Sequence, residues 1–248
     1  MDFPAVIRQR QTIIIPNNNN NDHGGVIIWF HGLGDSGQSW QETFMEHLRL
    51  PHLKIILPTA EKIPYSAQEN RYVSAWYSKN VTSKILAGDE QKTFEGAVKM
   101  VHCLIREQKA LGVPPKKIIV GGFGMGGGLA LYAGLTCEVQ IGGIACISSY
   151  IPNHKTLVNK IDANHSTPIF ISIGEADTMI PVSWTKGTVR LLNETYQMSN
   201  IEFKSYPDVR HALSLEGCID LSSWFLKCVP APTSSGRKKR NRKNKIRH

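Results

Sequence analysis

Short, almost wholly apolar runs recur along this chain and are separated by polar or amphipathic segments. Runs of this kind, bounded by Gly, Pro or Asn, are typical of strands that are buried on both faces. Their alternation with helical segments predicts an α/β protein, with a mainly parallel central sheet flanked by helices on both faces. The expected strands are 12–15, 26–30, 54–57, 118–121, 141–148, 168–174 and 201–206.

A helical period is clearest between Gln91 and Lys109. Phe94, Val98, Val101 and Ile105 recur at i, i+4, i+7 and i+11, which places them on one buried face of a helix. Glycine or proline near the segment ends sets further helix boundaries. The other expected helices are 126–135, 182–198 and 213–225.

Two connecting segments are expected to be loops. Five asparagines at 17–21 lie between the first two strands and predict a solvated hairpin loop. Residues 58–90 show no clear period, and a loop of that length in a compact domain is usually functional. Its aromatic residues predict either an acyl-binding wall or simple packing of the loop, and Trp76 is the expected substrate-binding residue. These aromatic residues are Tyr65, Tyr72, Trp76 and Tyr77.

The net charge of +9 is concentrated in a C-terminal tail. Eight of the 29 basic residues lie in 237–247, whereas none of the 20 acidic residues does, so residues 1–229 carry about +1. We therefore expect one folded domain over 1–229 and a disordered basic tail over 230–248. Such a tail predicts sequence-independent contact with polyanions, and nuclear import or a nucleic-acid arm stays open as an alternative.

The remaining composition excludes several classes of protein. Five scattered cysteines without a C-x-x-C pair argue against a disulfide scaffold and against a zinc site. No apolar stretch is long enough for a membrane span, and the N-terminus lacks the pattern of a secretory signal. The expected location is therefore the cytoplasm.

Candidate chemistry gathers at the ends of four expected strands, where open α/β sheets bind their ligands. One of these strand ends reads Gly122-Phe123-Gly124-Met125-Gly126, in the strand–turn–helix setting of the G-x-S-x-G nucleophile elbow. Gly124 occupies the position of the serine. Glycine has no side chain that could attack a carbonyl or carry an acyl group. The four loops are 31–37, 122–126, 174–177 and 208–211.

The order nucleophile position, acid and base along the chain selects Gly124, Asp177 and His211. His211 would move a proton between the nucleophile and the leaving group, and Asp177 would orient and stabilise its ring. The backbone N–H groups of Leu33 and Met125 would bind the developing oxyanion. This assignment predicts a hydrolase scaffold whose activity is absent or strongly reduced.

Two other interpretations of these loops stay open. Residues 122–127 also satisfy the dinucleotide fingerprint G-x-G-x-x-G, although the expected acidic residue about 20 positions later is absent. Four serines could replace the missing nucleophile, but none lies in a G-x-S-x-G turn; they are Ser36, Ser39, Ser148 and Ser149. His31 is expected to shape the first loop and not to act as a base.

A resemblance to a known family rests on four segments in order: HGLGDSGQSW (31–40), GGFGMGG (121–127), GEADTMIPVSW (174–184) and FKSYPDVRHALS (203–214). They resemble the acyl-protein thioesterases and carboxylesterases, and most of all their lysophospholipase-like branch. The resemblance implies a single-domain α/β-hydrolase fold that cleaves acyl thioesters of proteins, or small esters, without metal or cofactor. The sequence departs from the family pattern at Gly124, where the family has its nucleophilic serine. A non-catalytic acyl- or protein-binding protein, or a tail-driven nucleic-acid-associated protein, is the alternative.

Overall fold

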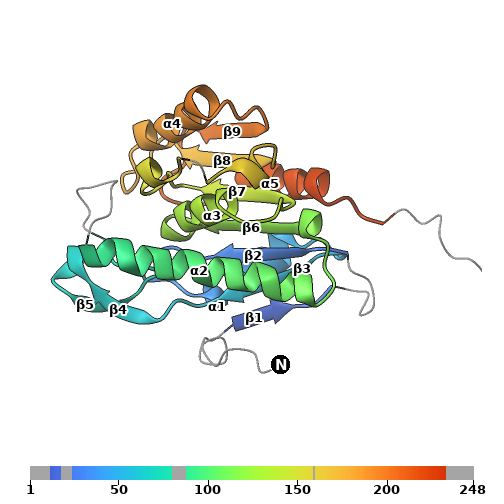
Figure 1. The fold of residues 1–248 in the computed structure, drawn as a ribbon, viewed down its shortest axis with the longest axis horizontal. Helices are drawn as coiled ribbons and strands as arrows, with labels where there is room; N and C mark the ends of the chain where they lie inside the picture. Colours follow the sequence, from blue (N-terminus) through green and yellow to red (C-terminus); the bar gives the residue numbers. More distant parts are fainter. Residues whose placement is uncertain (1–11, 18–23, 80–87, 159, 233–248) are drawn as a thin grey trace, which may run out of the picture.

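The computed structural model describes residues 12–17, 24–79, 88–158 and 160–232. Its strands are β1 (Thr12–Ile15), β2 (Val26–Phe30), β3 (Lys54–Pro58), β4 (Lys62–Tyr65), β5 (Arg71–Ser74), β6 (Ile118–Phe123), β7 (Gly143–Ile147), β8 (Ile169–Gly174) and β9 (Ile201–Tyr206). Seven of them form one sheet in the order β1-β3-β2-β6-β7-β8-β9 (Figure 1). Only β1 runs antiparallel to its neighbour, so the prediction of a mainly parallel sheet is confirmed.

Helices cover both faces of this sheet. They are α1 (Gly37–Thr43), α2 (Gly88–Ala110), α3 (Met125–Leu135), α4 (Val182–Arg190) and α5 (Leu215–Cys228). Alternate residues of β2 enter two separate apolar cores, because side chains alternate between the faces of a strand. Ile28 and Phe30 pack with α2 and α3, which lie in front of the sheet in Figure 1, whereas Ile27 and Trp29 pack with α1 and α5.

The first two strands do not form the hairpin that the sequence predicted. β1 pairs with β3, and Ile13 lies opposite Leu57. β2 is already paired on both sides, with β3 and with β6, so β1 can join the sheet only at its edge. Residues 18–23, which include most of the asparagine run, lie outside the described residues.

The segment from residue 58 onward is more ordered than the expected loop. β4 and β5 form a separate antiparallel hairpin in which Ile63 lies opposite Val73. Glu69 and Asn70 adopt left-handed backbone conformations at its turn. Pro64 and the exposed polar residues of these two strands hid the period that marks a strand in the sequence. Residues 80–87 lie outside the described part of the chain.

Other element boundaries differ from the predictions only in part. The helix expected over 182–198 ends as an α-helix at Arg190 and continues as one π-helical turn, Leu191–Thr195. Helix α1, which the sequence analysis missed, begins after Ser36, whose hydroxyl caps it. Within the described residues, no helix is long and apolar enough to cross a bilayer. The tail beyond residue 232 lies outside the described residues.

Candidate functional site at the strand ends

The turn between β6 and α3 has the geometry of a strand-to-helix elbow. Gly124 has φ 54° and ψ −120°, a region that is strained for any residue with a side chain. Its N–H donates to the carbonyl of Ile147 at 2.9 Å, and its own carbonyl accepts from the N–H of Gly128 at 3.2 Å. The elbow is thereby joined both to strand β7 and to the first turn of α3.

The glycines around the elbow serve different purposes. A Cβ atom at Gly126 would lie 2.2 Å from the carbonyl oxygen of Phe30, so this glycine permits the close approach of α3 to β2. One at Gly122 would lie 2.5 Å from the same oxygen and 2.6 Å from the backbone of Gly126, so this glycine of β6 permits the approach of both. At Gly124 the nearest atom to such a Cβ is Nε2 of His211, at 3.4 Å, an ordinary contact distance. Packing therefore explains the neighbouring glycines without a bound dinucleotide, whereas a Cβ on Gly124 would make only ordinary contacts with His211 and Gly32.

Asp177 and His211 come from the loops that follow β8 and β9, two adjacent parallel strands. These loops are tied together, because the N–H of Ala176 donates to the carbonyl of Val209 at 3.0 Å. Gly174 permits this approach, since a Cβ there would lie 2.1 Å from the same carbonyl oxygen. The arrangement places Nδ1 of His211 2.7 Å from Oδ2 of Asp177.

The surroundings of this pair orient both side chains. The Asp177 side chain is wholly buried, and its Oδ1 accepts from the N–H groups of Met179 and Ile180 at 2.8 and 2.9 Å. A carboxylate only accepts hydrogen bonds, so Nδ1 of His211 is the donor and Nε2 remains on the side of Gly124. The centre of the Phe123 ring lies 4.7 Å from that of the imidazole, with the two rings tilted by 54°. A group on Gly124 would therefore meet the basic nitrogen of an oriented histidine.

His31 shapes the first strand-end loop, as the sequence predicted. Its Nε2 lies 2.9 Å from the N–H of Ala60, which can only donate, so this nitrogen carries no proton. The other ring nitrogen, Nδ1, donates to the carbonyl of Gly32 at 2.7 Å. Burial lowers the pKa of His31, and the hydrogen bond to Gly32 opposes that effect only in part. The ring is thus held neutral, in one tautomer, by two backbone groups.

The two predicted oxyanion donors, Leu33 and Met125, belong to two different strand-end loops. Met125 is the first residue of α3, so its N–H has no acceptor within the helix. Leu33 lies in the loop after β2, where the N–H of Gly34 donates to the carbonyl of Ser74 and the Asp35 carboxylate accepts from the Trp40 indole. Both residues line the same cavity as Gly124 and His211.

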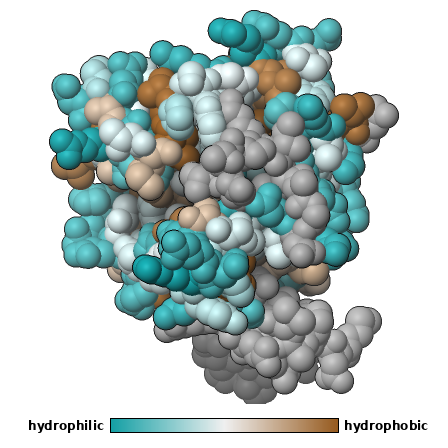
Figure 2. Space-filling model, turned by 90° about the vertical axis from the view of Figure 1, so that its left-hand side faces the viewer, coloured by the Kyte–Doolittle hydropathy of each residue, from teal (hydrophilic) through white to brown (hydrophobic). Residues whose placement is uncertain are grey.

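This cavity has a volume of about 640 Å³. It opens on the face that bears the carboxyl ends of the parallel strands, the left-hand side of Figure 1. Figure 2 shows that the described surface of this face is largely hydrophilic, with hydrophobic residues in separate small groups. Besides the residues already described, side chains from the hairpin and from the ends of β7 and β8 line the cavity; they are Tyr65, Gln68, Val73, Tyr77, Lys79, Ser149, Tyr150, Met179 and Ile180.

The aromatic residues of the hairpin segment divide into two groups. Tyr65 and Tyr77 line the cavity. Tyr72 is 72% exposed, and Trp76, the expected substrate-binding residue, is not among the residues that line the cavity. Trp76 instead donates from Nε1 to the carbonyl of His31 at 2.8 Å. The sequence analysis missed Lys79, Tyr150 and Met179, whose only signal was a position close to a strand end.

Three of the four alternative serines form hydrogen bonds away from His211. Ser36 and Ser39 belong to the cap of α1, and the buried Ser148 hydroxyl has no partner among the described residues. Ser149 reaches the cavity, but its hydroxyl donates to the carbonyl of Tyr150. In the part of the chain that the structure describes, none of these hydroxyls hydrogen-bonds to His211. Among all the described residues, no group of three or more His, Cys, Asp or Glu side chains could hold a metal ion.

Comparison with known proteins gives a consistent result. The phospholipase/carboxylesterase family matches residues 11–229. Acyl-protein thioesterase 1 of Gibberella zeae is 30% identical over 218 residues, which cover 84% of this chain and 92% of that protein. Among solved structures, acyl-protein thioesterase 2 of Zea mays superposes with a TM-score of 0.74 at 26% identity, over 88% of this chain and 99% of that one. SOBER1 of Arabidopsis thaliana superposes with a TM-score of 0.75 at 26% identity, over 82% of this chain and 98% of that one.

Proposed function

This chain belongs to the phospholipase/carboxylesterase family of α/β hydrolases, and from that premise we propose that its cavity binds carboxylic esters or acyl thioesters and hydrolyses them slowly at most. One observation carries the proposal. A Cβ atom on Gly124 would lie 3.4 Å from Nε2 of His211, and this distance supports Gly124 as the nucleophile position without its side chain. Names of relatives such as acyl-protein thioesterase 1 support an acylated protein, or a small ester, as the ligand.

With a serine at position 124, the reaction would follow the usual two steps. His211 would take the hydroxyl proton while the oxygen attacks the carbonyl carbon, and the oxyanion would accept from the N–H groups of Leu33 and Met125. His211 would then protonate the leaving alcohol or thiol. Water, activated by His211, would cleave the acyl group from the serine oxygen and release the carboxylic acid.

Gly124 removes the covalent route, because no oxygen can accept the acyl group. The remaining route is direct attack by a water molecule that passes its proton to His211. In a well-studied serine protease, loss of the serine lowers kcat by about 10⁶, while the oxyanion hole and substrate binding still accelerate the reaction by roughly 10³–10⁴ over water. Ester hydrolysis by the chain with Gly124 is therefore expected to be slow.

The alternative function is binding without turnover, as in a protein that retains acyl groups or acylated proteins. The missing nucleophile is the observation that favours it. The buried, hydrogen-bonded Asp177 and its contact with His211 favour the hydrolytic proposal, since a cavity used only for binding has no need of an oriented base.

Hydrolysis of an activated ester such as p-nitrophenyl butyrate tests the proposal. Gly124→Ser is expected to raise kcat/KM by about 10³-fold or more, whereas Gly124→Ala, the matched variant without a hydroxyl, should not. Adding Asp177→Asn to the serine variant should remove most of the gain, because the wrong tautomer of His211 would then be held. Equal activity of the original chain and Gly124→Ser would show that another residue is the nucleophile. No activity in either, with retained ester binding, would establish the binding function.

A further inference from the structure

The cavity beside Gly124 is polar in one part of its wall. Six lining residues carry hydroxyl, amide or ammonium groups: Tyr65, Gln68, Tyr77, Lys79, Ser149 and Tyr150. They come from the hairpin segment and from the residues that follow β7. A cavity that binds only a hydrocarbon chain has no use for such groups, because a buried polar group needs a hydrogen-bond partner.

Within the described residues, two tyrosines of this wall have hydroxyls that form no hydrogen bond. Tyr65 is 5% exposed and Tyr77 is 3% exposed, and both line the cavity. Among the described residues, neither hydroxyl forms a hydrogen bond, and neither is sealed completely away from the cavity. Two nearly buried donors without a protein partner are the signature of a site that a polar ligand completes.

Burial also keeps these hydroxyls protonated. It raises the pKa of Tyr65 to about 12, with a smaller contribution from the charge of Glu90. Burial likewise raises the pKa of Tyr77 well above its usual range, and the nearby Tyr65 adds to the effect. Both side chains are therefore hydrogen-bond donors throughout the physiological pH range.

Lys79 brings an ammonium group to the same wall. The lysine is 8% exposed, and its Nζ donates to the Tyr150 hydroxyl. The same nitrogen lies 4.6 Å from the centre of the Tyr150 ring and 5.5 Å from that of Trp184. These contacts hold the ammonium against aromatic faces at the boundary of the cavity, where its attraction for an anion is stronger than in bulk water.

We propose that this polar wall binds a carboxylate of the substrate, so that the favoured ligand is the ester or thioester of a short dicarboxylic acid and not a plain fatty acyl chain. The inference rests on the proposed function, because it places the ester group beside Gly124. A carboxylate accepts several hydrogen bonds, so it could accept from the hydroxyls of Tyr65 and Tyr77 while it lies near the ammonium group of Lys79. A hydrocarbon chain in the same place would leave the hydroxyls of Tyr65 and Tyr77 unsatisfied.

Binding to the original chain tests the proposal, because Gly124 leaves the ester intact long enough to act as a ligand. Monoethyl glutarate and ethyl pentanoate have the same backbone and differ in a terminal carboxylate or methyl group. Calorimetric or competition titration should give a Kd at least about tenfold lower for monoethyl glutarate. Tyr77→Phe and Lys79→Met should each remove most of this preference without weakening ethyl pentanoate. Tyr72→Phe, on an exposed side chain outside the cavity, is the matched control and should change neither value.

A kinetic measurement separates this inference from the proposed function. In the Gly124→Ser background, the p-nitrophenyl hemiester of glutaric acid should have a higher kcat/KM than p-nitrophenyl pentanoate, and Tyr77→Phe should lower that ratio. If Gly124→Ser hydrolyses neither ester, the proposed function fails. The Kd values of the two ethyl esters still test whether the polar wall binds a carboxylate. Equal Kd values for the two ethyl esters would overturn the inference. The inference would also be overturned if the lower Kd for monoethyl glutarate were unchanged in each of Lys79→Met, Tyr77→Phe and Tyr65→Phe.

Discussion

The indole nitrogen of Trp76 donates a hydrogen bond of 2.8 Å to the main-chain carbonyl of His31, and the two rings pack 4.8 Å apart. This contact joins the segment after the β4–β5 hairpin to the loop that carries Leu33. Ala60 makes a second connection through Nε2 of the same histidine. The loop that would supply an oxyanion donor is therefore held by residues that lie about thirty to forty-five positions later in the chain.

Replacing Trp76 by Phe should loosen this loop. The substitution retains a ring against Phe30 but leaves the buried carbonyl of His31 without its indole donor. We expect the free energy of unfolding to fall by about 1–3 kcal/mol in urea titrations. In the Gly124→Ser background, kcat should fall more than KM rises, because the Leu33 N–H would be displaced. Unchanged stability and unchanged kcat would contradict the assigned role of Trp76.

Mild acid should destabilise the fold through His31. The pKa of this histidine is lowered from its ordinary value of 6.5 because the neutral ring is buried. The unfolded chain therefore binds the proton more readily than the folded chain. The resulting stability is fully present above pH 6.5 and is lost as the pH falls from 6.5 toward the lower pKa of the folded state.

Thermal melts at pH 7.5 and pH 5.5 measure this dependence. His31→Asn should lower the melting temperature at pH 7.5 and show a smaller further decrease at pH 5.5 than the original chain. His165→Asn serves as the control, since that ring is exposed and far from the loop in sequence. An identical pH dependence in the original chain and His31→Asn would rule out His31 as the source.

The two glycines of the elbow should respond very differently to the same substitution. Gly124→Ala adds a Cβ with room around it and has only the cost of a left-handed backbone, about 1–2 kcal/mol. Gly126→Ala would force a Cβ to within 2.2 Å of the Phe30 carbonyl, so α3 would have to move away from the sheet. We expect loss of several kcal/mol or failure to fold, measured by chemical unfolding. Similar losses for both variants would show that Gly124 is also required for packing.

The basic tail should bind polyanions independently of the folded domain. Its eight positive charges predict binding to single-stranded nucleic acid that weakens steeply as salt is raised, with a slope of log K against log salt of up to about −0.7 per neutralised phosphate. Deleting residues 233–248 should abolish this binding at low salt and leave the thermal transition unchanged. A large decrease in melting temperature would show that the tail contributes to the fold.

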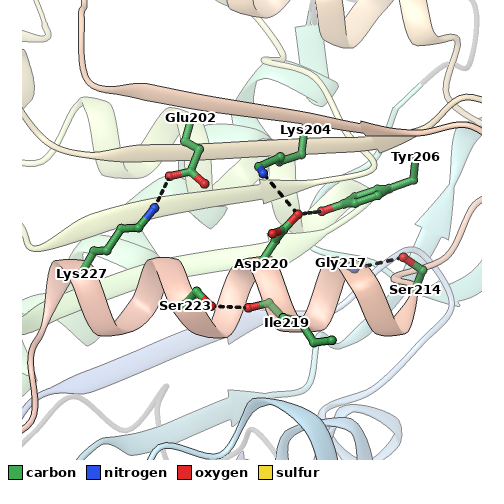
Figure 3. A network of polar contacts seen from close by, with 9 residues as sticks. All are labelled: Glu202, Lys204, Tyr206, Ser214, Gly217, Ile219, Asp220, Ser223 and Lys227. Carbon is green, nitrogen blue, oxygen red and sulfur yellow. Dashed lines mark hydrogen bonds and ion pairs between the residues drawn. The ribbon is translucent and has the colours of Figure 1, made fainter.

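Tertiary contacts between the last strand and the last helix show what local patterns leave open. Glu202, Lys204 and Tyr206 alternate along β9 and meet Lys227 and Asp220 of α5 (Figure 3). Residues two apart share one face of a strand, and residues seven apart share one face of a helix. The sequence therefore predicts each face separately. Whether this face of α5 lies against this face of β9 depends on how the whole helix packs on the sheet.

The sequence by itself determined the parallel core, because buried strands and amphipathic helices are local patterns that burial enforces. It also determined that a glycine stands at position 124, ahead of Asp177 and His211, since this follows from residue identity alone. The pairing of β1 with β3, the hairpin, and the positions of Trp76 and Lys79 were decided only in three dimensions. Edge pairing and the lining of a cavity arise from contacts between distant segments, and no local period records them.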